Sequence, residues 1–193
     1  MRDGLVYKKV GSPEAAALEA GILRELRDRG VAVPEVLACR VNLLVLEYLP
    51  GEPLPDWIAR GGYTPDELAG ALCGWFGAFY AAVPWGELRG DVNGRNFLWD
   101  GAKLYGVDFE ERCRGPQARD AGRLAAFIGT YDTLDPARRD ALAEAFTEGF
   151  SGRFCCDMEE IFAERDLELK AMGERRRSAP PPRPAATPPR RGI

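Results

Sequence analysis

The sequence predicts an α+β protein in which a small sheet-rich N-terminal lobe, residues 1–49, is followed by a mainly helical C-terminal lobe, residues 50–172. The β-leaning segments are concentrated before residue 50, whereas most helix-forming segments follow it. The change coincides with Pro50-Gly51, a turn signal that we interpret as a hinge between the lobes. Residues 173–193 are rich in proline and arginine and are predicted to be a disordered tail.

The N-terminal lobe is expected to contain one helix and three short strands, at 4–10, 36–41 and 43–49. Ser12 is a good N-cap and Pro13 fits the first helical position, so the helix should run from there to about residue 29. Gly30 is placed to end it. The apolar stripe of this helix is predicted to consist of Ala15, Leu18, Ile22, Leu23 and Leu26.

The C-terminal lobe is expected to contain four helices and a hairpin. The sequence TPDE at 64–67 forms a capping box and starts a helix that runs to about residue 83. Segments 97–99 and 103–105 flank Asp100-Gly101, which predicts a short hairpin. The remaining helices are predicted at 117–130, at 136–149 with Asp135 as cap, and at 157–172.

The composition excludes several classes of enzyme. The 193 residues include no histidine, so no Ser-His-Asp hydrolase and no His-ligated zinc or haem site can be built from them. The five cysteines are odd in number and scattered, which favours free thiols in a cytoplasmic protein. No run of about 18 apolar residues is present, so we expect neither a membrane span nor a signal peptide.

The charge is unevenly distributed along the chain. Residues 173–193 hold six arginines and one glutamate, a net charge of +5. Because the whole chain has a formal charge of −4, the other 172 residues carry −4 − 5 = −9. The acidic body argues against nucleic acid as a partner of the folded part. The basic tail is expected to be a solubilising appendage, with nucleic-acid binding through it as the alternative.

Five polar residues stand where a purely structural protein would not need them. Lys8 lies in a strand, and Glu19 falls inside the apolar stripe of the first helix, where a carboxylate is costly without a cation. Asp91 and Asn96 are five residues apart in a loop, and Asp108 ends a strand just after the hairpin. Two carboxylates and an amide oxygen suit Mg²⁺, and a lysine steadied by a glutamate suits phosphates. Together they predict phosphoryl transfer from a nucleotide.

The motifs around these residues resemble the aminoglycoside-phosphotransferase branch of the kinase-like superfamily. The sequence RGDVNGRN at 89–96 is similar to the HGDxxxxN catalytic loop, and VDFE at 107–110 to the metal-binding DFG or DFE strand end. Similar matches are the helix segment EAGILREL at 19–26 with GVAVP at 30–34, the hinge LEYLPG at 46–51 and Asp120, the helix residue that steadies the catalytic loop. The resemblance covers residues 5–150 and extends to RIO-type kinases and to the kinase of the tRNA-threonylcarbamoylation complex.

The resemblance implies a two-lobed protein-kinase-like fold with a truncated N-lobe. It implies an ATP-dependent phosphotransferase that moves the γ-phosphoryl group of ATP, or of GTP, to a hydroxyl acceptor. Asp91 would orient the acceptor hydroxyl and accept its proton, while Asn96 and Asp108 would bind Mg²⁺.

The nucleotide site is also implied by the resemblance. Lys8 would hold the phosphates and pair with Glu19, and backbone groups of Glu47 and Leu49 would meet the adenine. Lys8 is preferred to Lys9 because Val6 and Lys8 share one face of the strand.

The sequence departs from the family pattern in three ways. Arg89 replaces the histidine of the catalytic loop, the Gly-rich strand-turn-strand that normally covers the phosphates is missing before Lys8, and the helical lobe is short. Three functions therefore stay open: a small-molecule kinase, a protein-directed kinase or ATPase that acts within a complex, and a nucleotide-binding pseudokinase. The acceptor cannot be read from the sequence, although the acidic body is compatible with a cationic one.

Overall fold

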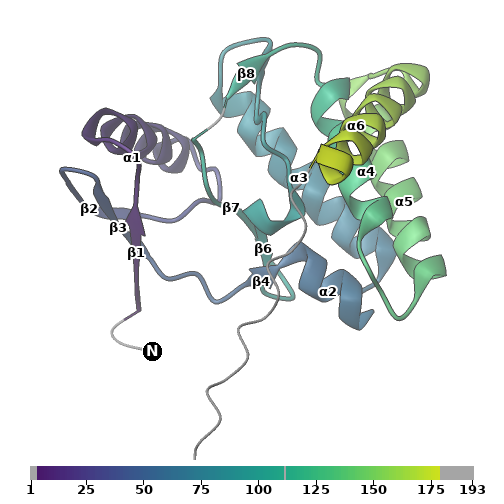
Figure 1. The fold of residues 1–193 in the computed structure, drawn as a ribbon, viewed down its shortest axis with the longest axis horizontal. Coiled ribbons are helices and arrows are strands. Elements are labelled where there is room, and N and C mark those ends of the chain that lie inside the picture. Colours follow the sequence, from purple (N-terminus) through teal and green to yellow (C-terminus); the bar gives the residue numbers. More distant parts are fainter. Residues whose placement is uncertain (1–3, 111, 179–193) are drawn as a thin grey trace, which may run out of the picture.

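The computed structural model describes residues 4–110 and 112–178, which form a mixed α+β fold. The N-terminal strands make one antiparallel sheet in the order β1-β3-β2, from β1 (Leu5–Lys9), β3 (Leu43–Glu47) and β2 (Val36–Arg40). Helix α1 (Pro13–Asp28) packs against β2 and β3. Figure 1 shows this sheet and α1 on one side of the molecule and the remaining helices on the other.

Helix α1 begins and ends as the sequence predicts. The Ser12 hydroxyl oxygen accepts a hydrogen bond from the Ala15 N–H at 3.2 Å, and Gly30 follows the helix with φ of +84°. The predicted apolar stripe was wrong at Leu18, which is 63% exposed. At 100° per residue Leu18 lies about 140° from the buried Leu23, whereas Glu19 lies only about 40° from it.

A second three-stranded sheet packs against the helices of the C-terminal part. The predicted hairpin is present as β6 (Phe97–Trp99) and β7 (Leu104–Gly106), with Leu98 opposite Tyr105 and β4 (Glu52–Pro53) added to β6. The Asp100 carboxylate closes the turn by accepting hydrogen bonds from the N–H groups of Ala102 and Lys103.

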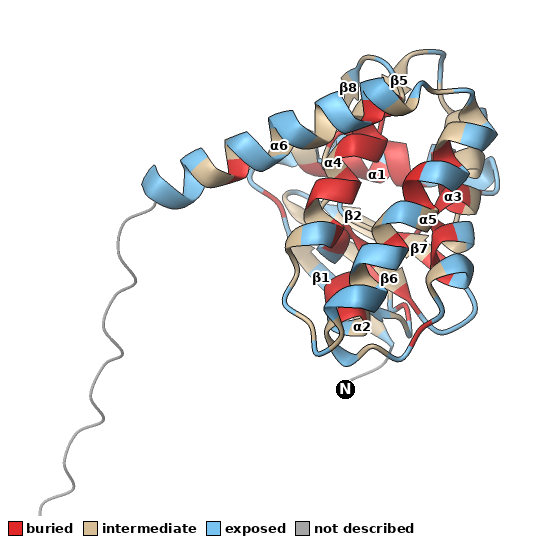
Figure 2. Cartoon of the chain, turned by 90° about the vertical axis from the view of Figure 1, so that its right-hand side faces the viewer, coloured by how far each residue is buried: buried red, intermediate tan, exposed pale blue. Residues whose placement is uncertain are grey.

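The helical part consists of α3 (Pro65–Ala82), α4 (Ala118–Thr130), α5 (Pro136–Phe154) and α6 (Met158–Ser178). Helix α3 packs on α5, while α4 lies between α5 and α6. The buried faces of these helices and of the hairpin meet in an aromatic core, red in Figure 2, whose largest members are Trp75, Phe76, Phe79, Phe97, Phe146 and Phe150.

The predicted caps of α3 and α5 have different outcomes. Asp135 caps α5 by accepting from the Arg138 N–H at 3.0 Å, as expected. The capping box before α3 was wrong, because the Thr64 hydroxyl bonds to the Glu67 carboxylate at 3.0 Å and makes no backbone cap.

Four short elements were not predicted: α2 (Leu54–Arg60), the 3₁₀ turn η1 (Gly94–Asn96), and the strands β5 (Glu87–Leu88) and β8 (Cys113–Arg114). The predicted start of the disordered tail at residue 173 was also wrong. Residues 173–178 continue α6, where arginines suit the negative end of the helix dipole and Arg175 pairs with Glu168 at 2.5 Å. Figure 2 shows the end of α6 projecting from the body. The rest of the predicted tail, residues 179–193, lies outside the described residues.

Within residues 4–110 and 112–178, no helix combines the length and the apolar character that crossing a membrane requires.

Candidate functional site

Lys8 and Glu19 are in direct contact, as expected from the sequence. The Lys8 Nζ lies 2.8 Å from both carboxylate oxygens of Glu19, which is 1% exposed on the inner face of α1. The same Nζ lies 2.9 Å from Asp108 Oδ1 and 2.9 Å from Glu110 Oε1. Burial acts to lower the pKa of Lys8, but the hydrogen bonds with these three carboxylates outweigh it and raise the pKa above its ordinary value. The ammonium group is therefore charged at neutral pH.

The segment after β7 is tied to α1 by the same glutamate. Glu19 Oε1 accepts a hydrogen bond from the Phe109 N–H at 3.2 Å. Asp108 itself has φ of +62°, in the left-handed region that few residues other than glycine adopt. The left-handed backbone of Asp108 and the hydrogen bond of the next residue, Phe109, to Glu19 thus hold the Asp108 side chain toward Lys8.

The loop that carries Asp91 is stabilised by its own side chains. Asp91 Oδ1 accepts from the Asn93 N–H at 3.1 Å, and Asp91 Oδ2 accepts from Asn96 Nδ2 at 2.9 Å. Asp91 and Asn96 are therefore brought together by direct contact.

Asp120 fixes the start of this loop from the first turn of α4. Its carboxylate accepts from the backbone N–H groups of Arg89 at 2.7 Å and Gly90 at 3.2 Å, and from the Tyr80 hydroxyl at 3.0 Å. Burial raises the pKa of Asp120, although these three hydrogen bonds act in the opposite direction. Asp120 thus holds the backbone at the point where the loop begins.

Arg89 connects the two segments, and its role was not foreseen. Its side chain is fully buried, Nη2 donates to the carbonyl oxygens of Val107 at 2.6 Å and Asp108 at 2.5 Å, and the guanidinium lies 4.2 Å from the Phe109 ring centroid. Burial lowers the pKa of Arg89 to about 10, so it stays charged at neutral pH. The sequence signal was the arginine in place of the family's histidine.

A cavity of about 420 Å³ separates the N-terminal sheet from the hairpin. Its walls are largely apolar, and its polar end contains Lys8, Glu19 and Asp108; the other lining residues include Val6, Pro34, Leu46, Glu47, Leu49 and Leu98. Five of the predicted site residues therefore line one cavity. Asp91 and Asn96 are not among its lining residues.

Glu47 is partly committed to other contacts. Its backbone N–H donates to the Glu35 carbonyl oxygen at 2.9 Å, and its carboxylate contacts Arg27 at 2.9 Å. The Glu47 N–H and carboxylate are therefore already paired within the protein.

The three residues expected to act with Mg²⁺ make different side-chain contacts. Asp108 contacts Lys8, whereas Asp91 and Asn96 contact each other. In the part of the chain that the structure describes, no group of three His, Cys, Asp or Glu side chains is arranged to hold a metal ion. The donor types remain the hard oxygens that Mg²⁺ prefers.

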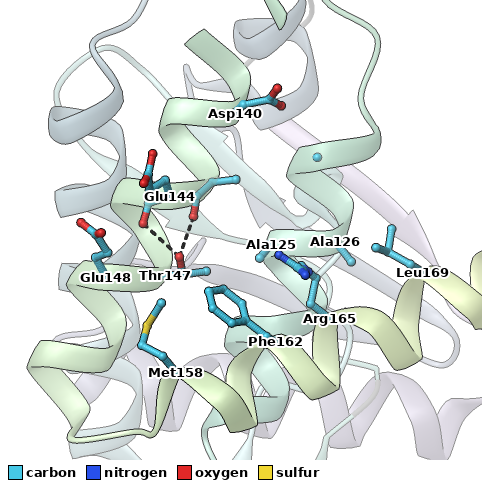
Figure 3. Close-up of a pocket in the computed structure, with 12 residues that line it drawn as sticks. Ala125, Ala126, Asp140, Glu144, Thr147, Glu148, Met158, Phe162, Arg165 and Leu169 are labelled. Atoms are coloured by element: carbon cyan, nitrogen blue, oxygen red, sulfur yellow. Dashed lines mark hydrogen bonds between the residues drawn. The ribbon is translucent and has the colours of Figure 1, made fainter. Parts of the chain in front are cut away.

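A cavity of about 440 Å³, slightly larger, lies between α4, α5 and α6 (Figure 3). It contains none of the predicted site residues. The Thr147 hydroxyl within it bonds to the carbonyl oxygens of Ala143 and Glu144 in its own helix, at 3.0 and 2.9 Å. We therefore place the candidate site at the smaller cavity, where charged groups from distant segments converge.

Comparison of the chain with protein-family models and with curated proteins gives no match.

Proposed function

We propose that the protein is an ATP-dependent phosphotransferase of the aminoglycoside-phosphotransferase type, with a two-lobed kinase-like fold, which transfers the γ-phosphoryl group to a hydroxyl acceptor. The observation that carries the proposal is the Lys8–Glu19 ion pair at the polar end of an apolar cavity, in contact with Asp108. A lysine fixed by a buried glutamate is a point charge suited to phosphates.

The two ends of the cavity suit the two ends of a nucleotide. Val6, Leu46 and Leu98 offer apolar contacts for a base, and the backbone near Leu49 can meet its polar edge. Lys8, at the other end, would interact with the phosphates. The Lys8 ammonium would then exchange Asp108 and Glu110 for phosphate oxygens.

The acceptor would bind beside the loop of residues 89–96. Asp91 would accept a hydrogen bond from the acceptor hydroxyl, orient its oxygen and take its proton. Its own hydrogen bonds with Asn93 and Asn96 hold the carboxylate in place for this task. Asn96 and Asp108 would hold Mg²⁺, which, when bound, neutralises charge on the phosphates.

A nucleotide-binding assay with matched variants tests the proposal. Wild-type protein is expected to bind ATP with Mg²⁺ and to release ADP in the presence of an acceptor. Lys8→Ala should weaken ATP binding about tenfold or more, because one charge-assisted contact to phosphate is lost. Lys9→Ala removes the exposed neighbouring lysine and should leave the affinity unchanged. Wild-type protein that binds no nucleotide would contradict the proposal.

A second candidate function is nucleotide binding without transfer. The contact between Asp108 and Lys8 favours it, because this ion pair competes with a metal for the Asp108 carboxylate. In that case ATP would bind, Lys8→Ala would weaken binding, and no panel of hydroxyl compounds would produce ADP. Turnover by the wild type would decide against this candidate.

A further inference from the structure

A second concave site lies beside the loop that carries Asp91, between the C-terminal end of α4 and the last turns of α6, which pack side by side (Figure 1). Its volume is about 280 Å³. Its eight lining residues include three arginines, Arg95, Arg175 and Arg176, and no carboxylate. The pocket is therefore locally basic on a body that is acidic as a whole.

The pocket is linked to Asp91 through one of its lining residues. Asn93 lines it, and the Asn93 N–H donates to Asp91 Oδ1 at 3.1 Å. The Tyr131 hydroxyl, from the wall of the pocket, accepts from the Gly94 N–H at 2.8 Å and lies 3.4 Å from Asn93 Oδ1. A ligand held by this pocket would therefore lie beside the loop that carries the group we propose as the catalytic base.

The charge available in the pocket comes from two arginines. Arg175 is paired with Glu168 at 2.5 Å. Arg95 in η1 and Arg176 in α6 both line the pocket. Neither makes an ion pair within residues 4–110 and 112–178. Burial raises the pKa of Tyr131 to about 12, so its hydroxyl adds no negative charge at neutral pH.

We propose that this pocket binds an oxyanion, phosphate or carboxylate, of the acceptor, so that the substrate is an anionic hydroxyl compound. The inference depends on the proposed function. Guanidinium groups bind carboxylate and phosphate oxygens with paired, directional hydrogen bonds, and two of them converging here favour an anion. A polycationic acceptor such as an aminoglycoside would meet like charge at the same place. The local charge thus reverses the preference suggested by the acidic body.

Anion binding can be tested without nucleotide. Inorganic phosphate and acetate are titrated separately into the ¹⁵N-labelled full chain at constant ionic strength, and the backbone amides of Gly94 and Tyr131 are followed by NMR. Saturable shifts are expected in the wild type. Arg95→Gln and Arg176→Gln should each weaken binding about threefold to fivefold, as expected for an exposed charge contact. A response to phosphate alone identifies a phosphorylated acceptor, and an equal response to acetate identifies a carboxylate.

Arg177→Gln is the matched control, because Arg177 is exposed on the same helix but does not line the pocket. It should leave the titration unchanged. Equal weakening by Arg177→Gln, or the absence of saturable shifts in the wild type, would overturn the inference, since the arginines would then act only as a diffuse charge.

Activity measurements separate this inference from the proposed function. With ATP and Mg²⁺, glycerol phosphate or glycerate should be a better acceptor than kanamycin, and Arg176→Gln should raise KM with kcat unchanged. Turnover of kanamycin alone, without anion binding, would overturn the anionic acceptor and retain the phosphotransferase. Saturable anion binding without any ATP turnover would retain the pocket as an oxyanion site and overturn the phosphotransferase.

Discussion

The Arg89 Nη2 lies 2.5 Å from the carbonyl oxygen of Asp108, and this bond joins the loop of Asp91 to the left-handed residue that faces Lys8. The buried guanidinium also contacts the Val107 carbonyl oxygen and stacks on Phe109. One side chain therefore supports both halves of the proposed site.

Replacing Arg89 should loosen this connection. Arg89→Met keeps much of the length and the apolar contact but removes the donor of two part-buried hydrogen bonds to carbonyl oxygens, which costs about 1–3 kcal/mol of unfolding free energy. Urea denaturation measures the change. Arg40→Met removes an exposed arginine at the end of β2 and should change the free energy by less than about 0.5 kcal/mol. Equal stability of Arg89→Met and the wild type would show that the bonds to residues 107 and 108 contribute nothing net.

Removing Lys8 from its ion pair with Glu19 should lower the free energy of unfolding. Lys8→Met leaves the buried Glu19 with the Phe109 N–H as its remaining partner among those described here, and we expect a loss of about 1–3 kcal/mol. The value lies below that of a fully enclosed pair because the Lys8 side chain is 22% exposed. Chemical denaturation checks it, with Lys9→Met as the exposed control; a larger loss for Lys9→Met would contradict the assignment.

The stabilising effect of Lys8 should decrease at high pH. Its pKa is raised on folding, so the native state keeps the proton at pH values where the unfolded chain releases it. The stability contribution is therefore complete below the ordinary lysine value of about 10.4 and declines as pH rises through the raised native pKa. The difference in unfolding free energy between wild type and Lys8→Met should be constant from pH 6 to about 9 and smaller at about pH 11. A difference that grows with pH would have the wrong sign.

The sequence and the structure agree best where local patterns determine the contact. The period of α1 places Glu19 near Leu23, and this was enough to predict a buried carboxylate that needs a cation. The further contacts of Lys8 with Asp108 and Glu110 join residues about 100 positions apart. They depend on how the sheet and the hairpin pack, which no local pattern specifies.

The basic pocket beside Asp91 was hidden for the same reason. Composition alone led us to treat residues 173–193 as one tail, although the prolines begin only at residue 180. Helix α6 instead continues far enough to bring Arg176 to the same cavity as Arg95. The distance between these arginines in the sequence gave no signal of this proximity.

Asp91 and Asp108 should have separable effects on activity. Asp91→Asn preserves shape but removes the charge that accepts the hydroxyl proton, so nucleotide binding should persist while phosphoryl transfer falls about 10²-fold or more. Asp108→Asn should instead weaken the Mg²⁺ dependence of ATP binding as well as the rate. Isothermal titration and steady-state ADP release measure the two effects. Equal losses of nucleotide affinity in both variants would contradict the separate roles.

Truncations on either side of the end of α6, at Ser178, should affect stability differently. Truncation after Ser178 removes only residues outside the described helix and should leave the melting temperature unchanged. Truncation after Met172 removes Arg175, one of two arginines that pair with the nearly buried Glu168, and shortens the helix at the end where arginines suit its dipole. We expect a loss of about 0.5–1 kcal/mol, or about 1–4 °C in Tm, by differential scanning calorimetry. Arg175→Gln in the full chain should reproduce part of this loss, whereas Arg177→Gln should not. A large drop on truncation after Ser178 would mean that residues 179–193 contribute to the stability of the folded protein.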